Sequence, residues 1–406
     1  MKINNEIGNV QLMQKINRLK VLDYIRDNGP AARPEIAKST GLSPSSITNI
    51  VAYLLEKKLV AEMGQVDSKE VGRKATLVKF NPESMNIISI DIESASINFA
   101  LTNLAGDIQK MKEIPLDRLI KDYEIFNIIK REISSMIDEG IKHHNAAIAG
   151  IGIAVSGLVD DNEKLIISSS LRWKGLSLKE YFESNFNLPV YVQNNSRTKA
   201  LWELKTRKDI SEKNVIFMDL TMGVGIINFY EQKINNAVIG EFGHTTVKKD
   251  GPLCFCGNHG CLEMMCSVDS VVNECDELLK NGKCEVLRKD MAGADRVLNY
   301  QSVLDAYQKG DKDVKEVLEE CGRYLGIGLA NIINVFNPQR IIINGDILLN
   351  CSFIYETAVE EAHKRAHEQF VKDLRFEMVS IGVEEAVKGV SLYVADKLFE
   401  LSGPEF

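Results

Sequence analysis

A short glycine-rich segment of this chain concentrates side chains that bind metals. Residues 244–261 contain two histidines and three cysteines, which are His244, Cys254, Cys256, His259 and Cys261. Thiolate and imidazole are donors that Zn²⁺ prefers, and three cysteines with one histidine form a closed set of the structural type. Neighbouring glycines let the backbone turn tightly enough for closely spaced thiolates to converge. The segment therefore predicts a structural Zn²⁺ site, more than a loop with unrelated buried thiols, and either histidine can complete it.

Length and composition limit the class of protein. At 406 residues the chain is too long for one compact core and predicts two or three domains. No apolar run approaches the ~20 residues of a membrane span, and the N-terminus lacks the apolar core of a signal peptide. The five cysteines outside the segment are scattered singly, as suits reduced thiols. We therefore expect a cytoplasmic protein with no membrane segment.

Charge is distributed unevenly along the chain. Residues 1–80 hold 13 Lys and Arg against 8 Asp and Glu, a net charge of +5. The whole chain carries −8, so the remainder carries −13. A basic head on an acidic body favours nucleic-acid contact confined to the head.

The order of helix and turn signals in the head predicts a winged helix-turn-helix. Apolar residues between 16 and 25 mark a first helix, which Asn28, Gly29 and Pro30 end. A short second helix spans residues 34–38, and Gly41 suits the turn after it. Ser43 and Pro44 are an N-cap and a first helical residue, so a third helix is expected from 45 to about 57.

The third helix and a following hairpin carry the candidate DNA contacts. Polar residues near the start of a recognition helix touch base edges, and a basic hairpin tip can enter a minor groove. Strands are expected at 59–62 and 75–78. The alternative is a helical bundle with polar surface serines. The predicted DNA-binding residues are Arg33, Ser45, Ser46, Thr48, Asn49, Arg73 and Lys74.

The acidic body shows two similar runs of strands and helices. Apolar strands are expected at 87–92, 97–101, 108–114 and 148–155, with a helix at 123–141 before the last of them. The second run has strands at 215–220, 224–230 and 341–343, with helices at 267–280, 303–306 and 314–335. The two runs fit two β-β-β-α-β halves with helical insertions, the second with fewer of its strands marked, and they predict two α/β lobes.

The metal segment also carries a family resemblance. Glu-x-x-His from Glu241, followed by Cys-x-Cys-Gly-x-x-Gly-Cys-Leu-Glu from Cys254, resembles the signature of the ROK family of sugar kinases and sugar-responsive repressors. The resemblance implies that the loop shapes one wall of a sugar site, and it favours His244 over His259 as the fourth ligand. The implied metal ligands are His244, Cys254, Cys256 and Cys261.

Other segments match the same family. Residues 150–160 are similar to its Gly-Ile-Gly-x-Pro-Gly-x-Val-Asp run, 171–174 to its Trp-containing segment, and 192–196 to its Asn-Asp pair. The family implies an actin/hexokinase-like (ribonuclease H-like) body, and the head resembles that of its repressors. The implied domains are 1–82, 83–200 and 201–406, with C-terminal helices able to pack back on the first lobe. The implied sugar-binding residues are Ser156, Gly157, Asn194, Asn195, Glu241, His244 and Glu263.

The chain departs from the family's kinases where phosphoryl transfer needs specific groups. Asn195 stands at the position of the catalytic aspartate, and an amide cannot accept a hydroxyl proton. Residues 90–96 lack the glycines of the first phosphate turn, and Glu93 adds a negative charge there. The second phosphate turn, 220–225, and the adenosine-side strand end, 343–346, match in part.

Together these patterns predict a non-catalytic, sugar-responsive transcriptional regulator, most simply a repressor. Its partners would be operator DNA and a monosaccharide, and it would act as a homodimer or homotetramer with structural Zn²⁺. Two alternatives stay open at this stage. One is an active ATP-dependent sugar kinase with an accessory DNA-binding head, and the other is a regulator released by a protein partner. The motifs indicate the class and leave the sugar open.

Overall fold

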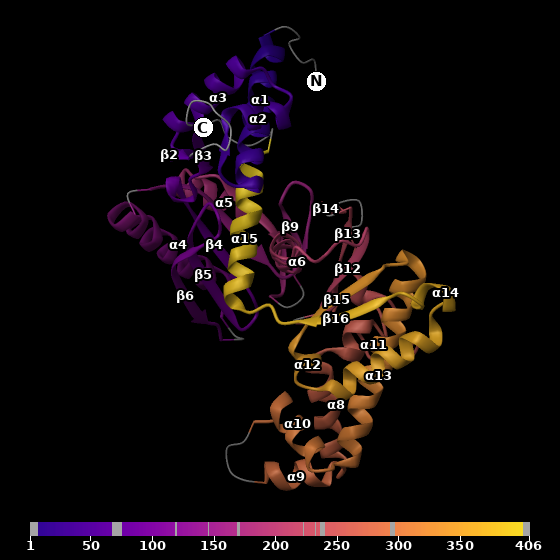
Figure 1. The fold of residues 1–406 in the computed structure, drawn as a ribbon. Coiled ribbons are helices and arrows are strands. Elements are labelled where there is room, and N and C mark those ends of the chain that lie inside the picture. The colour runs from indigo at the N-terminus through magenta and orange to yellow at the C-terminus, as the bar shows by residue number, and fades with distance from the viewer. Residues whose placement is uncertain are drawn as a thin grey trace.

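The computed structural model describes residues 7–66, 75–117, 120–144, 146–168, 171–221, 223–231, 233–235, 240–292 and 297–400. A helical head, a first α/β lobe and a second α/β lobe follow one another down the long axis of the molecule (Figure 1). A group of helices, α8 to α10, extends the second lobe away from the head. None of the helices in these ranges combines the length and apolar character that a bilayer span requires.

The head has the predicted helix-turn-helix with a hairpin. Its elements are α1 (Ile7–Asn28), β1 (Ala31–Ala32), α2 (Arg33–Thr40), α3 (Pro44–Glu56), β2 (Val60–Val66) and β3 (Ala75–Phe80), and the strands pair in the order β1-β3-β2. Ser43 caps α3 as expected, since its Oγ accepts the amide of Ser46 at 3.1 Å. Val21, Ile36 and Ile47 are fully buried between the helices.

The first lobe is built on a five-stranded sheet in the order β11-β7-β4-β5-β6. Strands β4 (Met85–Ile92), β5 (Ser96–Asn103) and β6 (Ile108–Pro115) run antiparallel, and β7 (Ala147–Val155) and β11 (Val190–Asn194) add in parallel. Helices α4 (Asp122–Glu139) and α5 (Leu178–Phe186) belong to this lobe. A small sheet, missed by the sequence analysis, contains β8 (Leu158–Val159), β9 (Leu165–Ser168) and β10 (Trp173–Leu176).

The second lobe repeats this arrangement in the order β14-β13-β12-β15-β16. Its strands are β12 (Asn214–Asp219), β13 (Gly225–Tyr230), β14 (Lys233–Ile234), β15 (Arg340–Asn344) and β16 (Arg375–Val379). Its helices are α7 (Leu262–Cys266), α8 (Val268–Lys280), α9 (Glu285–Met291), α10 (Tyr300–Gln308), α11 (Lys312–Phe336), α12 (Asp346–Leu349), α13 (Ser352–Arg365) and α14 (Glu368–Val371). The α/β prediction is confirmed, but each half has one more parallel strand, β11 or β16, than β-β-β-α-β allows.

Two helices join the parts of the molecule. Helix α6 (Asn195–Thr206) lies between the lobes, and α15 (Val383–Leu398) returns from the second lobe to pack on α6, β4 and β7 (Figure 1). The end of α15 enters the hydrophobic core of the head, where Val394, Leu398 and Phe399 share one buried cluster with Val21 and Leu22. Helix α15 therefore connects the second lobe, the first lobe and the head.

The packing of α15 on α6 depends on the absence of a side chain at Gly389. A Cβ at this position would overlap the carbonyl oxygen of Thr198 on α6. Backbone on both sides of this contact is held in helices, so relief would require the two helices to separate.

We predict that Gly389→Ala destabilises the protein. At an unconstrained helical site alanine is more stable than glycine by up to about 1 kcal/mol. Here the overlap with Thr198 outweighs that gain, and we expect a loss of about 1–3 kcal/mol in the free energy of unfolding. Denaturant unfolding of the variant, with the exposed Glu384→Ala on the same helix as control, measures the difference. A more stable Gly389→Ala variant would contradict the close contact.

Candidate functional site

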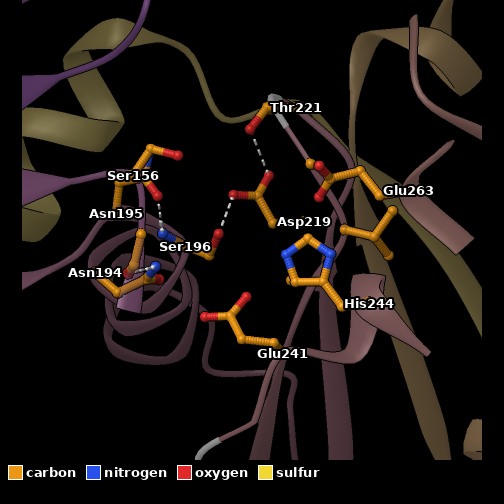
Figure 2. A pocket seen from close by; sticks show the side chains of 13 residues that line it. Ser156, Asn194, Asn195, Ser196, Asp219, Thr221, Glu241, His244 and Glu263 are labelled. Carbon is orange, nitrogen blue, oxygen red and sulfur yellow. Dashed lines mark hydrogen bonds between the residues drawn. The ribbon is translucent and has the colours of Figure 1, made fainter. Parts of the chain in front are cut away.

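A pocket between the lobes brings together the residues that the family resemblance singled out. All seven predicted sugar-binding residues line it, although they come from segments up to about a hundred positions apart (Figure 2). One side is formed by the turn after β7 and the start of α6, and the other by the turn after β12 and by residues 241–263. The lining residues are Ser156, Gly157, Asn194, Asn195, Ser196, Asp219, Thr221, Gly223, Val224, Gly225, Glu241, His244 and Glu263.

Asn194 is the N-cap residue of helix α6. Its Oδ1 accepts the backbone amide of Arg197 at 3.1 Å, and its Nδ2 donates to the carbonyl oxygen of Gly157 at 2.8 Å. The first bond is an N-cap, and the second ties the helix to the turn after β7. Both polar ends of Asn194 are thus engaged by the protein. Asn195 is itself 4 % exposed, and its Oδ1 accepts the amide of Ser196 at 2.9 Å.

The opposite side of the pocket presents two carboxylates and an imidazole. Glu241 and Glu263 flank His244, and all three side chains extend toward the cavity (Figure 2). Burial raises the pKa of Glu263, and the charge of His244 partly offsets this. Ionised carboxylates accept hydrogen bonds only, so this side suits a ligand with several hydroxyl donors.

Three polar lining residues, Ser196, Asp219 and Thr221, were not among the predicted sugar-binding residues. Asp219 lies at the end of β12, where its carboxylate accepts hydrogen bonds from Ser196 Oγ at 2.7 Å and Thr221 Oγ1 at 3.1 Å. Asn344 Nδ2, at the end of β15, donates to it at 2.9 Å. The available signal was the position of Asp219 at the carboxyl end of a buried strand, where ligands bind in open α/β sheets.

The cysteine segment folds into a compact cluster beside the pocket. The ligand atoms of His244, Cys254, Cys256 and Cys261 all lie within 4.8 Å of one another. The Sγ of Cys254 is 3.5 Å from Nδ1 of His244, and the sulfurs of Cys256 and Cys261 are 3.6 Å apart. His259 lies outside the cluster, since its Nδ1 is 3.2 Å from the carbonyl oxygen of Gly251. These side chains could together hold a metal ion.

The candidate DNA contacts divide into four groups. Ser45, Thr48 and Asn49 are exposed on α3. Ser46 is half-buried, and its backbone amide donates to Ser43 Oγ at 3.1 Å, so it belongs to the cap. Arg33 pairs with Glu62 of β2 at 2.9 Å across the surface. Arg73 and Lys74, which the sequence analysis assigned to a hairpin tip, lie outside the described residues.

The body matches a known family over most of its length. The model of the ROK family aligns with residues 87–397. The chain belongs to the ROK family. This region contains both lobes, the pocket and the cysteine cluster, so the family resemblance of the separate motifs extends to the whole body.

Similar proteins of known role include repressors. A xylose repressor of Bacillus spizizenii is 28% identical over 403 residues, covering 98% of this chain and 99% of the relative. An N-acetylglucosamine repressor of Escherichia coli is 29% identical over 346 residues, covering 84% of this chain and 83% of the relative. Both alignments are long enough to include parts of the head and the body.

Solved structures share the fold. A ROK family transcriptional regulator, described as a homologue of the Escherichia coli MLC protein, has a TM-score of 0.79 at 23% identity and covers 96% of this chain and 98% of its own. A ROK glucokinase from Streptomyces griseus, in complex with glucose and AMPPNP, has a TM-score of 0.63 at 21% identity. It covers 75% of this chain and 98% of its own. The kinase thus leaves a quarter of this chain without a counterpart.

We predict that the two hydrogen bonds of Asn194 can be separated by substitution. Asn194→Ala removes both the cap and the tie to Gly157, and should lower the free energy of unfolding by about 2 kcal/mol. Asn194→Ser keeps an oxygen that can accept the amide of Arg197 and loses only the bond to Gly157, so it should cost less. Denaturant unfolding of both variants measures this. Equal losses would show that the cap contributes nothing.

Proposed function

We propose that this chain is a sugar-responsive DNA-binding repressor of carbohydrate-utilisation genes. One observation carries the proposal: a winged helix-turn-helix head is joined to a ROK body whose pocket gathers amides, carboxylates and an imidazole. The relatives named as xylose and N-acetylglucosamine repressors support the same reading. The head supplies the DNA-binding part, and the pocket supplies a place for the effector.

The proposed effector is a monosaccharide. Glu241 and Glu263 would accept hydrogen bonds from its hydroxyl groups, and Asn195 would offer both a donor and an acceptor. Ser156 and Gly157 would close the pocket from the turn after β7, beside Asn194. This set of groups matches a small, neutral ligand with hydroxyls on several sides, as pockets with a few convergent polar groups do.

The proposed function is binding without chemistry. Transfer of a phosphoryl group to a sugar hydroxyl requires a group that accepts the hydroxyl proton. The amide of Asn195 has no such capacity, and Asn195 Oδ1 already accepts the amide of Ser196. An active kinase is therefore the less supported alternative.

The head would bind operator DNA as a homodimer or homotetramer. Ser45, Thr48 and Asn49 are exposed on α3. They would touch base edges in the major groove, as polar residues near the start of a recognition helix do. Arg33 would exchange its surface partner Glu62 for a DNA phosphate, since exposed ion pairs are worth little. Arg73 and Lys74 complete the proposal as wing contacts.

The structure offers a route from the pocket to the head. Helix α6 begins at the pocket, α15 packs along α6, and the end of α15 lies in the core of the head. Lys205 on α6 also pairs with Asp396 of α15 at 2.9 Å. A sugar that binds one arrangement of the lobes more tightly would shift α6, and thereby the head, toward that arrangement.

The proposed occupant of the cysteine cluster is Zn²⁺. Tetrahedral bonds of about 2.3 Å to sulfur and about 2.0 Å to nitrogen separate two sulfurs by about 3.8 Å and a sulfur from a nitrogen by about 3.5 Å. The distances in the cluster, 3.6 Å and 3.5 Å, fit this geometry. Zn²⁺ would hold the loop in shape. If Nδ1 of His244 is a ligand, Nε2 must carry the proton and is a donor.

We predict that Cys256→Ser removes the metal. Cys256 is exposed, so its substitution leaves the protein core intact, but it opens a closed four-ligand set. Purified wild-type protein should contain a single zinc ion per chain by mass spectrometry of metals, and the variant close to none, with a lower melting temperature. The control is Cys351→Ala, which removes a thiol outside the cluster. Retention of zinc by Cys256→Ser would contradict the assignment.

The proposed function is tested on DNA from the promoter upstream of the chain's own gene. We expect the protein to bind this DNA, and one sugar of a panel containing xylose, glucose and N-acetylglucosamine to weaken binding by about tenfold, an ordinary coupling between sites. Asn195→Ala should bind DNA but lose the response to sugar. The control is Asn273→Ala on the exposed face of α8.

Two outcomes would overturn the proposal. Formation of a sugar phosphate in the presence of ATP would show that the pocket is catalytic despite Asn195. DNA binding unaltered by every sugar in the panel would favour release by a protein partner.

A further inference from the structure

A buried lysine lies where the two lobes meet. Lys199, on the second turn of α6, is 2 % exposed. Its Nζ is 3.0 Å from Glu93 Oε1, in the turn after β4 of the first lobe. It is also 3.8 Å from Asp219 Oδ2 and 3.3 Å from Thr221 Oγ1, at the end of β12 in the second lobe. One ammonium therefore contacts both lobes at once.

The surroundings of this ammonium are strongly acidic. Burial alone would lower the pKa of Lys199, but the carboxylates of Asp219, Glu93 and Asp91 raise it above its ordinary value. Asp91, at the end of β4, is 1 % exposed, and burial raises its pKa to about 7. Removal of one partner from such a buried group leaves uncompensated charge, which is strongly destabilising. The lobes are thus held together here by a cation that the chain itself supplies.

The same group of charges borders the pocket. Asp219 accepts a hydrogen bond from Ser196, and both residues line the pocket next to Asn195 (Figure 2). Asp219 thereby links the ammonium of Lys199 to the first turn of α6. A shift of Asp219 would change the position of Ser196, and hence the edge of the pocket.

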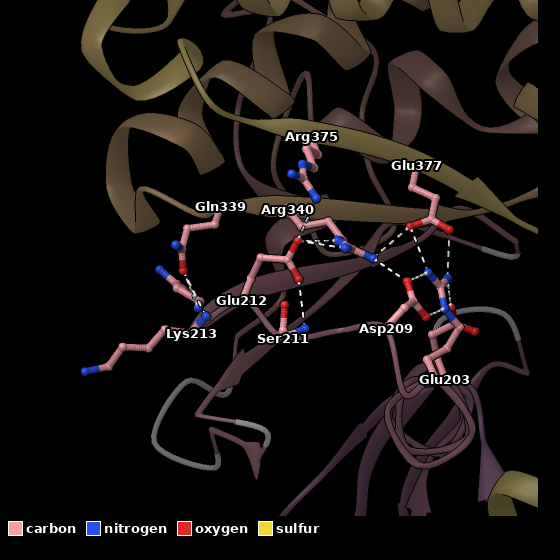
Figure 3. Close-up of polar contacts among 11 residues, drawn as sticks. Glu203, Asp209, Ser211, Glu212, Lys213, Gln339, Arg340, Arg375 and Glu377 are labelled. Atoms are coloured by element: carbon pink, nitrogen blue, oxygen red, sulfur yellow. Dashed lines mark hydrogen bonds and ion pairs between the residues drawn. The ribbon is translucent and has the colours of Figure 1, made fainter.

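The far end of α6 is also fixed to the second lobe. Arg207, which follows α6, pairs with Glu377 of β16 at 2.8 Å, and the buried Arg340 of β15 pairs with Glu212 and Asp209 (Figure 3). The position of α6 against the second lobe therefore depends on ion pairs at both ends. Among the described ion pairs named at these two ends, those of Lys199 include a carboxylate from the first lobe, Glu93.

We propose that Lys199 is a positioning residue for the pocket: it ties Glu93 of the first lobe to Asp219 of the second, and through the Asp219–Ser196 hydrogen bond it holds the start of α6 in the sugar-binding arrangement. This inference rests on the proposed sugar-binding function. It assigns to a side chain outside the pocket the role of setting the distance between the lobes.

The test uses full-length, metal-loaded protein and the variant Lys199→Met, which keeps much of the side-chain volume without the charge. The dissociation constants for xylose, glucose and N-acetylglucosamine are measured by calorimetry. We expect affinity for the bound sugar to fall by about tenfold or more, in the range of ordinary coupling between sites. Lys208→Met, at an exposed position just beyond α6, is the matched control and should bind sugar like the wild type. A Lys199→Met variant with a dissociation constant within about twofold of the wild type would overturn the proposal.

A second variant covers the case in which Lys199→Met does not fold. Glu93→Gln removes only the carboxylate of the first lobe and leaves Lys199 paired with Asp219. It should also weaken sugar binding, and by less than Lys199→Met when both fold, because one of the two main ion pairs remains. Unchanged sugar affinity in Glu93→Gln would equally overturn the proposal.

A further readout separates this inference from the proposed function. Without the ammonium, Glu93 of the first lobe and Asp219 of the second lose the cation between them, so the lobes should separate. Small-angle scattering should show a larger radius of gyration for Lys199→Met than for the wild type and the Lys208→Met control. If the wild type binds no sugar, the proposed function fails, yet a larger radius would still support the tie between the lobes. An unchanged radius would refute it.

Discussion

Burial of a positive charge between two lobes is costly unless carboxylates surround it, and this requirement determines where helix α6 lies. Lys199 meets it with Glu93 from one lobe and Asp219 from the other. The helix then has little freedom to slide, because a small displacement would separate the ammonium of Lys199 from the carboxylate of Glu93 or of Asp219. The pocket begins at the N-terminus of this helix, so the geometry of the pocket follows from the position of the buried charge.

The general architecture could be predicted from the sequence because it rests on periodic and local signals. The cap at Ser43 and the run of small and β-branched residues in β7 are properties of neighbouring positions, and the structure has both as expected. Strand β16 was not predicted. Most of its residues are only partly buried, as at a sheet edge, so no apolar run marks it. Helix α15 was not given bounds in advance, because its buried face contacts three different parts of the molecule.

The candidate site was predictable to a similar extent and for a similar reason. The cysteine spacing and the family motifs identify side chains one segment at a time, and the fold places those segments around one pocket. Lys199 gives no such signal, since a lysine in a helix is most often a surface residue. Its role depends on Glu93 and Asp219, which lie 106 and 20 positions away in sequence, and no local pattern links them. Similarly, the choice between His244 and His259 depends on the course of the loop, which a spacing rule leaves open.

The sharing of α15 between the body and the head has a consequence for synthesis. The core around Val21 and Leu22 is completed by Leu398 and Phe399, almost at the far end of the chain. A nascent chain emerges N-terminus first, so the ribosome releases the head long before the residues that finish its core exist. A truncated product without α15 would have helix α3 exposed on a head whose hydrophobic core is incomplete. The head can complete its core only after Leu398 and Phe399 have been translated, so formation of the head is coupled to synthesis of the body.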